Sequence, residues 1–224
     1  MLSKTKGIVL SRIKYRETSI ITKIYTESFG LKSYIINGVR SKTSKIKTGL
    51  FQPLTLLELV VYNNEKSSLN RLSEIKCYSP YKSIPFEIKK SSIIIFLSEI
   101  LNKTLKEENP NPDLFKFLSE SFIHFDQAKE NYQNFHLQFL FQYSAYLGFF
   151  PSSVKDIVGD EQDLISDIEK KYIENLIDTN YNEQLNVTNE VRRSSLKYIL
   201  RFFRYHIENF GELNSEKILK EVLR

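Results

Sequence analysis

The chain has 224 residues, of which 41% are hydrophobic, 13% aromatic and 26% charged, and its formal net charge is +5. This balance excludes collagen-like, low-complexity and wholly disordered chains, and the length suits one or two domains. The single cysteine, Cys77, excludes an intrachain disulfide and a cysteine-based zinc site, and it fits a reducing compartment. Because no apolar run reaches the length of a membrane span and no signal peptide is evident, we expect a cytoplasmic protein.

The positive charge is concentrated in the first fifty residues. They contain eight Lys and three Arg against Glu17 and Glu27, a net charge of +9. Residues 51–80 are neutral, so residues 81–224 carry −4. A local excess of this size is typical of a surface that binds a polyanion. The alternative is a lysine-rich composition that serves solubility alone.

The first part of the chain predicts five short strands. β-Branched and aromatic residues favour strands near residues 8–10, 20–26, 31–36, 54–62 and 69–78. Phe29-Gly30, Asn37-Gly38 and residues 63–66 predict the tight turns between them, and residues 39–49 predict a basic loop. Short strands joined in this way suit a small barrel.

The apolar period becomes helical beyond Pro80 and Pro85. The spacing predicts helices around residues 93–105, 131–147, 169–178, 189–209 and 215–223, and one that begins at Asn111 and Pro112. Residues 152–168 show no clear period. We therefore predict an α+β chain of two domains, a barrel at 1–80 and an all-helical domain at 81–224.

Catalytic chemistry has little support in the sequence. His124, His136 and His206 all lie in helical patterns without a partner motif, and there is no phosphate-binding glycine loop or dinucleotide fingerprint. A hydrolase or transferase would need a metal or an activated nucleophile. We expect no enzyme, no metal site and no cofactor.

Two groups of cations are candidates for DNA contact. The loop after Gly38 holds Arg40, Lys42, Lys45 and Lys47 among hydroxyl side chains that also bind phosphate, and the strands before it hold Arg12, Lys14, Arg16 and Lys32. Tyr15, Tyr25, Phe29 and Tyr34 lie among these cations, as in proteins that stack single-stranded bases. The alternative is that these rings fill the barrel core.

A further basic stripe lies on the last long predicted helix. Its members follow helical spacing opposite an apolar face: Arg193, Lys197, Arg201 and Arg204. Such a stripe could bind an acidic peptide or a phosphate backbone, or it could be a solvated helix face.

Several short motifs, in order, resemble the bacterial RecO recombination mediators. They are Gly7-Ile8-Val9-Leu10, Tyr15-Arg16-Glu17-Thr18-Ser19, Tyr25-Thr26 through Phe29-Gly30, Asn37-Gly38-Val39-Arg40, Phe51-Gln52-Pro53-Leu54, Leu57-Glu58-Leu59 and Tyr146-Leu147-Gly148-Phe149-Phe150-Pro151. The similarity covers nearly the whole chain, and the ordered series is more specific than any one motif.

The resemblance implies an N-terminal OB-fold and a helical C-terminal domain. It also implies a DNA repair mediator that binds single- and double-stranded DNA, anneals strands and acts at the nucleoid. The implied partners are RecR, RecA and the acidic C-terminal tail of the single-stranded DNA-binding protein. Many relatives hold zinc after the Leu-Gly-Phe-Phe-Pro-like segment, but residues 152–168 contain no cysteine, so packing must order them. The competing hypothesis is a helical protein-interaction scaffold that does not bind DNA.

Overall fold

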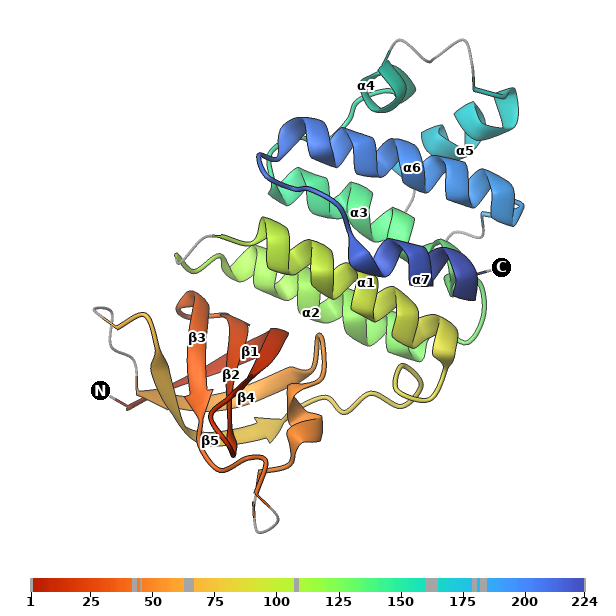
Figure 1. Ribbon diagram of the computed structural model, residues 1–224. Coiled ribbons are helices and arrows are strands. Elements are labelled where there is room, and N and C mark those ends of the chain that lie inside the picture. Colours follow the sequence, from red (N-terminus) through yellow and green to blue (C-terminus); the bar gives the residue numbers. More distant parts are fainter. Residues whose placement is uncertain are drawn as a thin grey trace. The chain divides into compact units, whose positions relative to one another are not determined.

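The structure is a computed structural model that describes residues 2–41, 44, 46–62, 67–106, 109–159, 165–178, 181 and 185–223. It divides into two compact units, Met1–Gln127 and Ala128–Arg224, called here the first and second units (Figure 1). Within the part of the chain that is described, every helix is too short or too polar to cross a bilayer.

The strands of the first unit close into a barrel. They are β1 (Leu2–Tyr15), β2 (Ser19–Thr26), β3 (Gly30–Ile36), β4 (Leu56–Tyr62) and β5 (Asn70–Cys77). Their order around the barrel is β1-β2-β3-β5-β4, with β3 and β5 parallel and the other pairs antiparallel. This is an OB-fold barrel, so the predicted α+β class with an N-terminal OB-fold is confirmed.

Strand β1 closes the barrel because it pairs on both sides. Its first half, Leu2–Ile8, pairs with β4, and its second half pairs with β2 as far as Tyr15. The register shifts between Val9 and Ser11, and such a bulge bends a strand. Gly7 lies where the strands approach closely, since a Cβ there would stand 2.6 Å from Ile24 Cγ2. The sequence predicted only the centre of this long strand.

The barrel interior is apolar and lies between the strands and η1 (Thr48–Phe51). Its buried residues alternate along the strands, as expected for one inward face. They include Val9, Ile24, Tyr34, Phe51, Leu57 and Val61. The predicted turn at residues 63–66 lies outside the described residues.

The first unit also contains α1 (Ile88–Thr104) and α2 (Pro112–Gln127). Asn111 caps α2 as predicted, because its Oδ1 accepts a hydrogen bond from Leu114 N at 3.0 Å. Helix α1 packs on the barrel at the β1 bulge, where Ser98 Oγ donates to the Leu10 carbonyl at 2.7 Å. The barrel and these two helices therefore share one packed unit.

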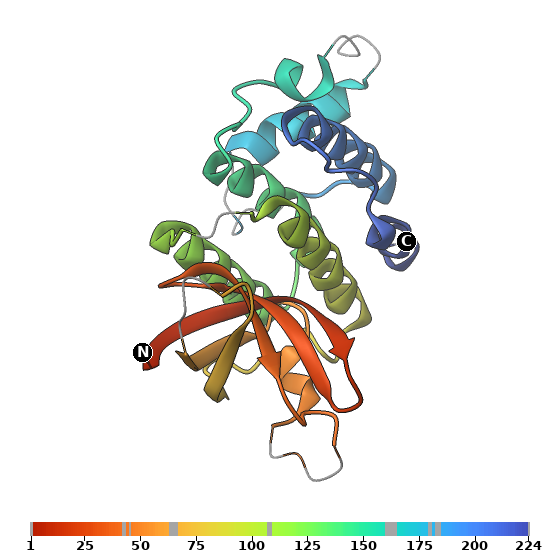
Figure 2. The ribbon, with the colours of Figure 1, turned by 60° about the vertical axis from the view of Figure 1, so that its left-hand side comes forward.

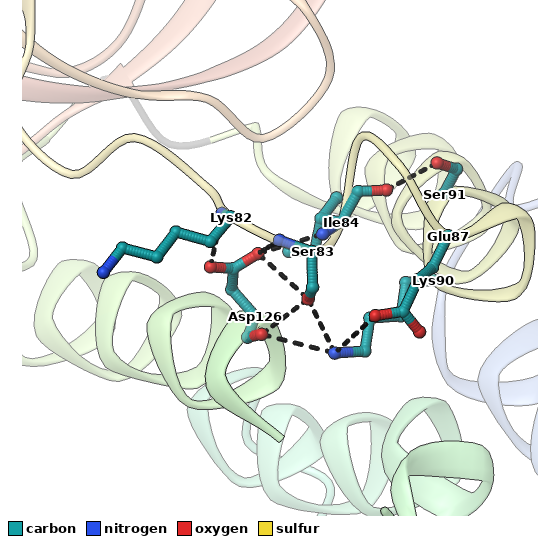
Figure 3. Close-up of polar contacts among 7 residues, drawn as sticks. All are labelled: Lys82, Ser83, Ile84, Glu87, Lys90, Ser91 and Asp126. Carbon is teal, nitrogen blue, oxygen red and sulfur yellow. Dashed lines mark hydrogen bonds and ion pairs between the residues drawn. The ribbon is translucent and has the colours of Figure 1, made fainter. Parts of the chain in front are cut away.

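A buried polar cluster ties the segment before α1 to the end of α2 (Figure 3). The Asp126 carboxylate accepts hydrogen bonds from the backbone N–H groups of Lys82, Ser83 and Ile84 at 2.8, 2.8 and 2.9 Å. Lys90 is 1% exposed, and its Nζ donates to Ser83 Oγ at 2.6 Å. Burial alone would raise the pKa of Asp126, but these donors lower it below its usual value. The cluster fixes the connection between barrel and helices.

The second unit is helical in its described residues. It contains η2 (Tyr132–Asn134), α3 (Phe135–Tyr146), α4 (Val154–Val158), α5 (Asp167–Asp178), α6 (Asn189–His206) and α7 (Asn214–Val222). The apolar stripe predicted on α6 is buried at Leu196, Ile199, Leu200 and Phe203.

Helix α4 was not predicted, because five residues are too few to show a helical period. A capping box begins it: Ser153 and Asp156 each bond the other's backbone. Burial of Val154, Ile157 and Val158 completes its local order.

The predicted domain boundary at residues 80 and 81 coincides with the change from strands to helices. The first compact unit nevertheless continues to Gln127 and includes α1 and α2. The 1–80 and 81–224 division remains a prediction, while the packing groups two helices with the barrel.

Candidate nucleic-acid interface

Arg12 and Lys14 lie on the part of β1 that extends past β4. The pairing of β1 with β4 ends at Ile8, while its pairing with β2 continues through Arg12 and Lys14 to Tyr15. Both cations are exposed. The second half of β1 thus holds two cations at the rim of the barrel.

The turn between β1 and β2 places Arg16 beside the segment that follows β3. Arg16 adopts a left-handed φ of 50°, and its guanidinium lies 5.2 Å from the centre of the Tyr15 ring. Arg40 N donates to Thr18 O at 2.9 Å, and Arg40 Nη1 donates to Arg16 O at 3.3 Å. These bonds join the two predicted DNA-binding segments.

Lys47 reaches the same end of the barrel through its neighbour Thr48, whose carbonyl accepts a hydrogen bond from Arg12 Nη1 at 2.7 Å. Figure 2 shows the β1–β2 turn beside the segment that follows β3. We call the exposed set formed by Arg12, Lys14, Arg16, Arg40 and Lys47 the cationic end. Glu17 is an exposed acid in the same turn. Lys42 and Lys45 lie outside the described residues.

Lys32 lies apart from the cationic end. On β3, Lys32 pairs with Ile24 of β2, and it lies four residues before Ile36, the end of β3. Four residues of strand span about 13 Å. Lys32 is also half-buried. The structure therefore separates it from the cationic end.

The aromatic residues among these cations mostly belong to the core. Tyr25 and Tyr34 are each 1% exposed, which excludes them as stacking platforms, and burial raises the pKa of Tyr34. Phe29 packs against the barrel core. Only Tyr15 among the four lies beside the cationic end, half-buried under Arg16. The interpretation that these rings fill the barrel core is correct for Tyr34, whereas Tyr25 is buried against α2, with its ring centre 6.3 Å from that of Phe115.

A groove of about 400 Å³ adjoins the cationic end within the first unit. It lies between the end of β1, η1 and α1, and Arg12 forms part of its wall. Glu99 and Asn102 of α1 line the opposite side, and Ser11 Oγ donates to Asn102 Oδ1 at 3.2 Å. No local pattern in the sequence indicates this groove, because its walls include segments about ninety residues apart.

The basic stripe on α6 makes contacts inside the second unit. Its arginines donate to backbone carbonyls: Arg193 to Lys220 O at 3.1 Å, Arg201 to Val158 O and Arg204 to Gly211 O at 3.4 Å. Arg204 also lies 3.6 Å from the Glu216 carboxylate, whereas Lys197 is exposed. Three of the four predicted residues thus join α6 to neighbouring segments. Their partner-binding role remains a prediction.

One α6 arginine that the sequence did not single out is buried. Arg192 is 9% exposed, and its Nε donates to Asn134 Oδ1 at 2.9 Å. Tyr172 donates to the same oxygen at 2.8 Å. Burial, with the nearby charge of Arg192, lowers the pKa of His136 to about 3. A neutral His136 therefore lies beside a buried cation.

Comparison with known proteins matches nearly the whole chain. The family described as "Recombination protein O N terminal" matches residues 1–81, and "Recombination protein O C terminal" matches residues 85–216. A "DNA repair protein RecO" of Flavobacterium psychrophilum is 36% identical over an alignment of 241 positions, and one of Bacteroides fragilis is 35% identical over 240. Each alignment covers 99% of both chains. The chain belongs to the RecO family.

One of the motifs that resemble the RecO family lies at the end of α3. The segment from Tyr146 to Pro151 ends α3, and Gly148 adopts a left-handed φ of 84°. Phe149 then packs edge-on against Phe203, with ring centres 5.2 Å apart, and stacks on His206 at 4.8 Å. The predicted RecO resemblance is confirmed, and this segment anchors the end of α3 to α6.

Proposed function

We propose that this RecO-family chain binds single- and double-stranded DNA, anneals complementary strands and helps load RecA onto DNA coated with single-stranded DNA-binding protein. The coarser part of this proposal, a role in DNA repair and recombination, rests on family membership and on the repair function named for its relatives. The finer part, which is DNA binding and strand annealing by this chain, rests on the cationic end of the barrel.

The observation that carries DNA binding is the cationic end of an OB-fold barrel. Five exposed cations from two separate segments gather there around one exposed glutamate, Glu17. OB-folds bind oligonucleotides through strand faces and loops, and Lys and Arg neutralise phosphates. Neutralising two strands at once lowers their mutual repulsion, which favours pairing.

The proposed partners are RecR and the acidic tail of the single-stranded DNA-binding protein. Charge complementarity favours the α6 stripe for the tail, with exposed Lys197 offering an ammonium to the acidic residues. We propose that the protein acts without catalysis or a cofactor, at the nucleoid in the cytoplasm.

Salt dependence tests the DNA interface. If the five cations each contact one phosphate, log affinity for single strands should fall against log salt with a slope of about −3.5. Neutralising three of them in a Lys14→Gln, Arg16→Gln, Lys47→Gln variant should bring the slope to about −1.4. Fluorescence anisotropy with labelled oligonucleotides measures both slopes, and fluorescence-monitored annealing of coated complementary strands should slow in the variant.

The matched control is Lys171→Gln in α5, which removes one exposed charge and should leave the slope unchanged. An unchanged slope in the triple variant, with normal thermal unfolding, would refute the interface. Retention of a protein partner after nuclease treatment, with no mobility shift on DNA, would favour the scaffold hypothesis instead.

A further inference from the structure

The groove beside the cationic end combines apolar and hydrogen-bonding surfaces. Its volume of about 400 Å³ falls within the range of small-molecule sites. Leu10 and Phe51 form its floor but are only 1% and 0% exposed, so Ile95 of α1 and Pro53 supply the apolar surface that a ligand can contact. The side chains with hydrogen-bonding groups are Ser11, Arg12, Gln52, Ser98, Glu99 and Asn102. A flat apolar ring with polar edges matches this lining.

Arg12 makes the groove continuous with the cationic end. It lines the groove, and its guanidinium donates to Thr48 O, next to Lys47. A DNA strand whose phosphates contact Arg12 and Lys47 would therefore pass the mouth of the groove. Bases of single strands can turn away from their neighbours and bind in such pockets.

We propose that this groove binds one unstacked base of single-stranded DNA and prefers guanine. The proposal rests on the DNA-binding function proposed above, and it adds base preference to an interface that otherwise contacts only phosphates. The sugar-phosphate chain remains at the cationic end, and the base lies in the open groove over Arg12, Ile95 and Glu99.

Glu99 determines the preference for guanine. A carboxylate has only acceptor atoms and can accept two parallel hydrogen bonds. Guanine offers two adjacent donors on its Watson–Crick edge, N1–H and the N2 amino group, whereas thymine offers one donor between two carbonyls.

The lining favours a base over a peptide from a protein partner. An acidic peptide would pair with the cationic end but offer no adjacent donors to Glu99, and a purely apolar peptide would gain nothing from the neighbouring cations. A base on a polyanionic strand uses the apolar lining, the carboxylate and the cationic end together.

The test compares guanine with inosine, which lacks only the N2 amino group. Anisotropy titrations use the full chain and short thymidine oligonucleotides that carry isolated guanines, or inosines at the same positions. The wild type should bind the guanine strand about five-fold more tightly, the lower end for a two-bond base contact. Glu99→Gln should abolish this ratio, because a glutamine side chain has a single acceptor oxygen.

Glu17→Gln is the matched control, since it removes an exposed acid from the same interface but outside the groove. It should raise affinity for both strands and leave the guanine-to-inosine ratio at about five. Equal affinity of the wild type for the two strands, with normal salt dependence, would overturn the groove proposal while the DNA interface stands. Absence of salt-dependent binding would overturn the proposed function itself.

A second pair of variants tests the groove without changing charge. Ile95→Ser alters an exposed groove residue, and Ile88→Ser alters an exposed residue of the same helix outside the groove. Ile95→Ser should weaken binding of the guanine strand about three-fold without changing the salt slope, which corresponds to burial of part of one aliphatic side chain. Equal effects of the two variants, or loss of a protein partner with DNA binding unchanged, would overturn the proposal.

Discussion

The cationic end of the barrel and helix α6 both carry closely spaced arginines and lysines, but these side chains differ in exposure. All five cations of the cationic end are exposed. In α6, Arg192 is buried, and Arg193 and Arg201 are half-buried with guanidinium groups bonded to backbone carbonyls. A polyanion reaches the first set without displacing packed contacts.

The difference arises from what lies next to each cation. At the barrel, β1 continues beyond its pairing with β4, so Arg12 and Lys14 meet solvent. Around α6, carbonyls at the ends of neighbouring segments have no helical partner, and arginine donors satisfy them. The spacing of cations in the sequence therefore does not reveal whether they bind a partner or complete a fold.

The largest effect that this comparison predicts is at Arg192. Replacing it with alanine removes one of the two donors to Asn134 Oδ1 and the guanidinium donors to Asn189 Oδ1 and the Val187 carbonyl, and it opens a cavity. The free energy of unfolding should fall by about 3 kcal/mol, with the salt slope of DNA binding unchanged. Urea unfolding and anisotropy measure the two quantities. Lys197→Ala, an exposed residue of the same helix, should change stability by less than about 0.5 kcal/mol.

The pH dependence of stability tests whether His136 is buried beside the Arg192 charge. Its pKa is about 3 in the folded state and about 6.5 when unfolded, so below pH 6.5 the unfolded chain binds a proton that the folded chain does not. Stability should therefore be full above pH 6.5 and fall by up to about 1.4 kcal/mol per pH unit as pH drops toward 3. Urea unfolding between pH 7.5 and 5 would show this slope.

His136→Gln should flatten that slope, because glutamine does not titrate. A Glu169→Gln variant is the comparison, since Glu169 is a carboxyl whose pKa is lowered and which titrates only at lower pH. Burial also lowers the pKa of His124, which leaves a small slope of the same sign. If the slope between pH 7.5 and 5 is undiminished in His136→Gln, Arg192 and His136 do not form the buried pair described here.

The positions of the strands and long helices along the chain follow from the pattern of apolar and polar residues. The strand order needs the β1 bulge and the close approach at Gly7, which neither period nor propensity reveals. The first half of β1 was missed because Lys4 and Lys6 make it polar, although Thr5 between them is buried. For α4, the spacing of Ser153 and Asp156 matches a capping box, although the helix is too short to show a helical period.

The site was harder to predict than the fold. Arg12, Lys14, Arg16, Arg40 and Lys47 do gather at one end of the barrel, because a strand end, a turn and a loop meet there. Lys32 could not be separated from them without the strand register. The bond from Arg201 to a carbonyl 43 positions away is a tertiary contact that no local pattern encodes.

The smallest expected effect is at Arg16, which combines exposure with a left-handed backbone. Its φ of 50° is unfavourable for a residue with a Cβ, and glycine adopts it freely. Arg16→Gly should therefore raise the free energy of unfolding by about 0.5 kcal/mol while lowering single-strand affinity about five-fold at 0.1 M salt, the contribution of one phosphate contact. Lys14→Gln loses a charge from regular strand, so it should lower affinity equally without stabilising the protein. A less stable Arg16→Gly chain would contradict the expected relief of backbone strain. An unchanged affinity would show that the Arg16 side chain does not contact DNA.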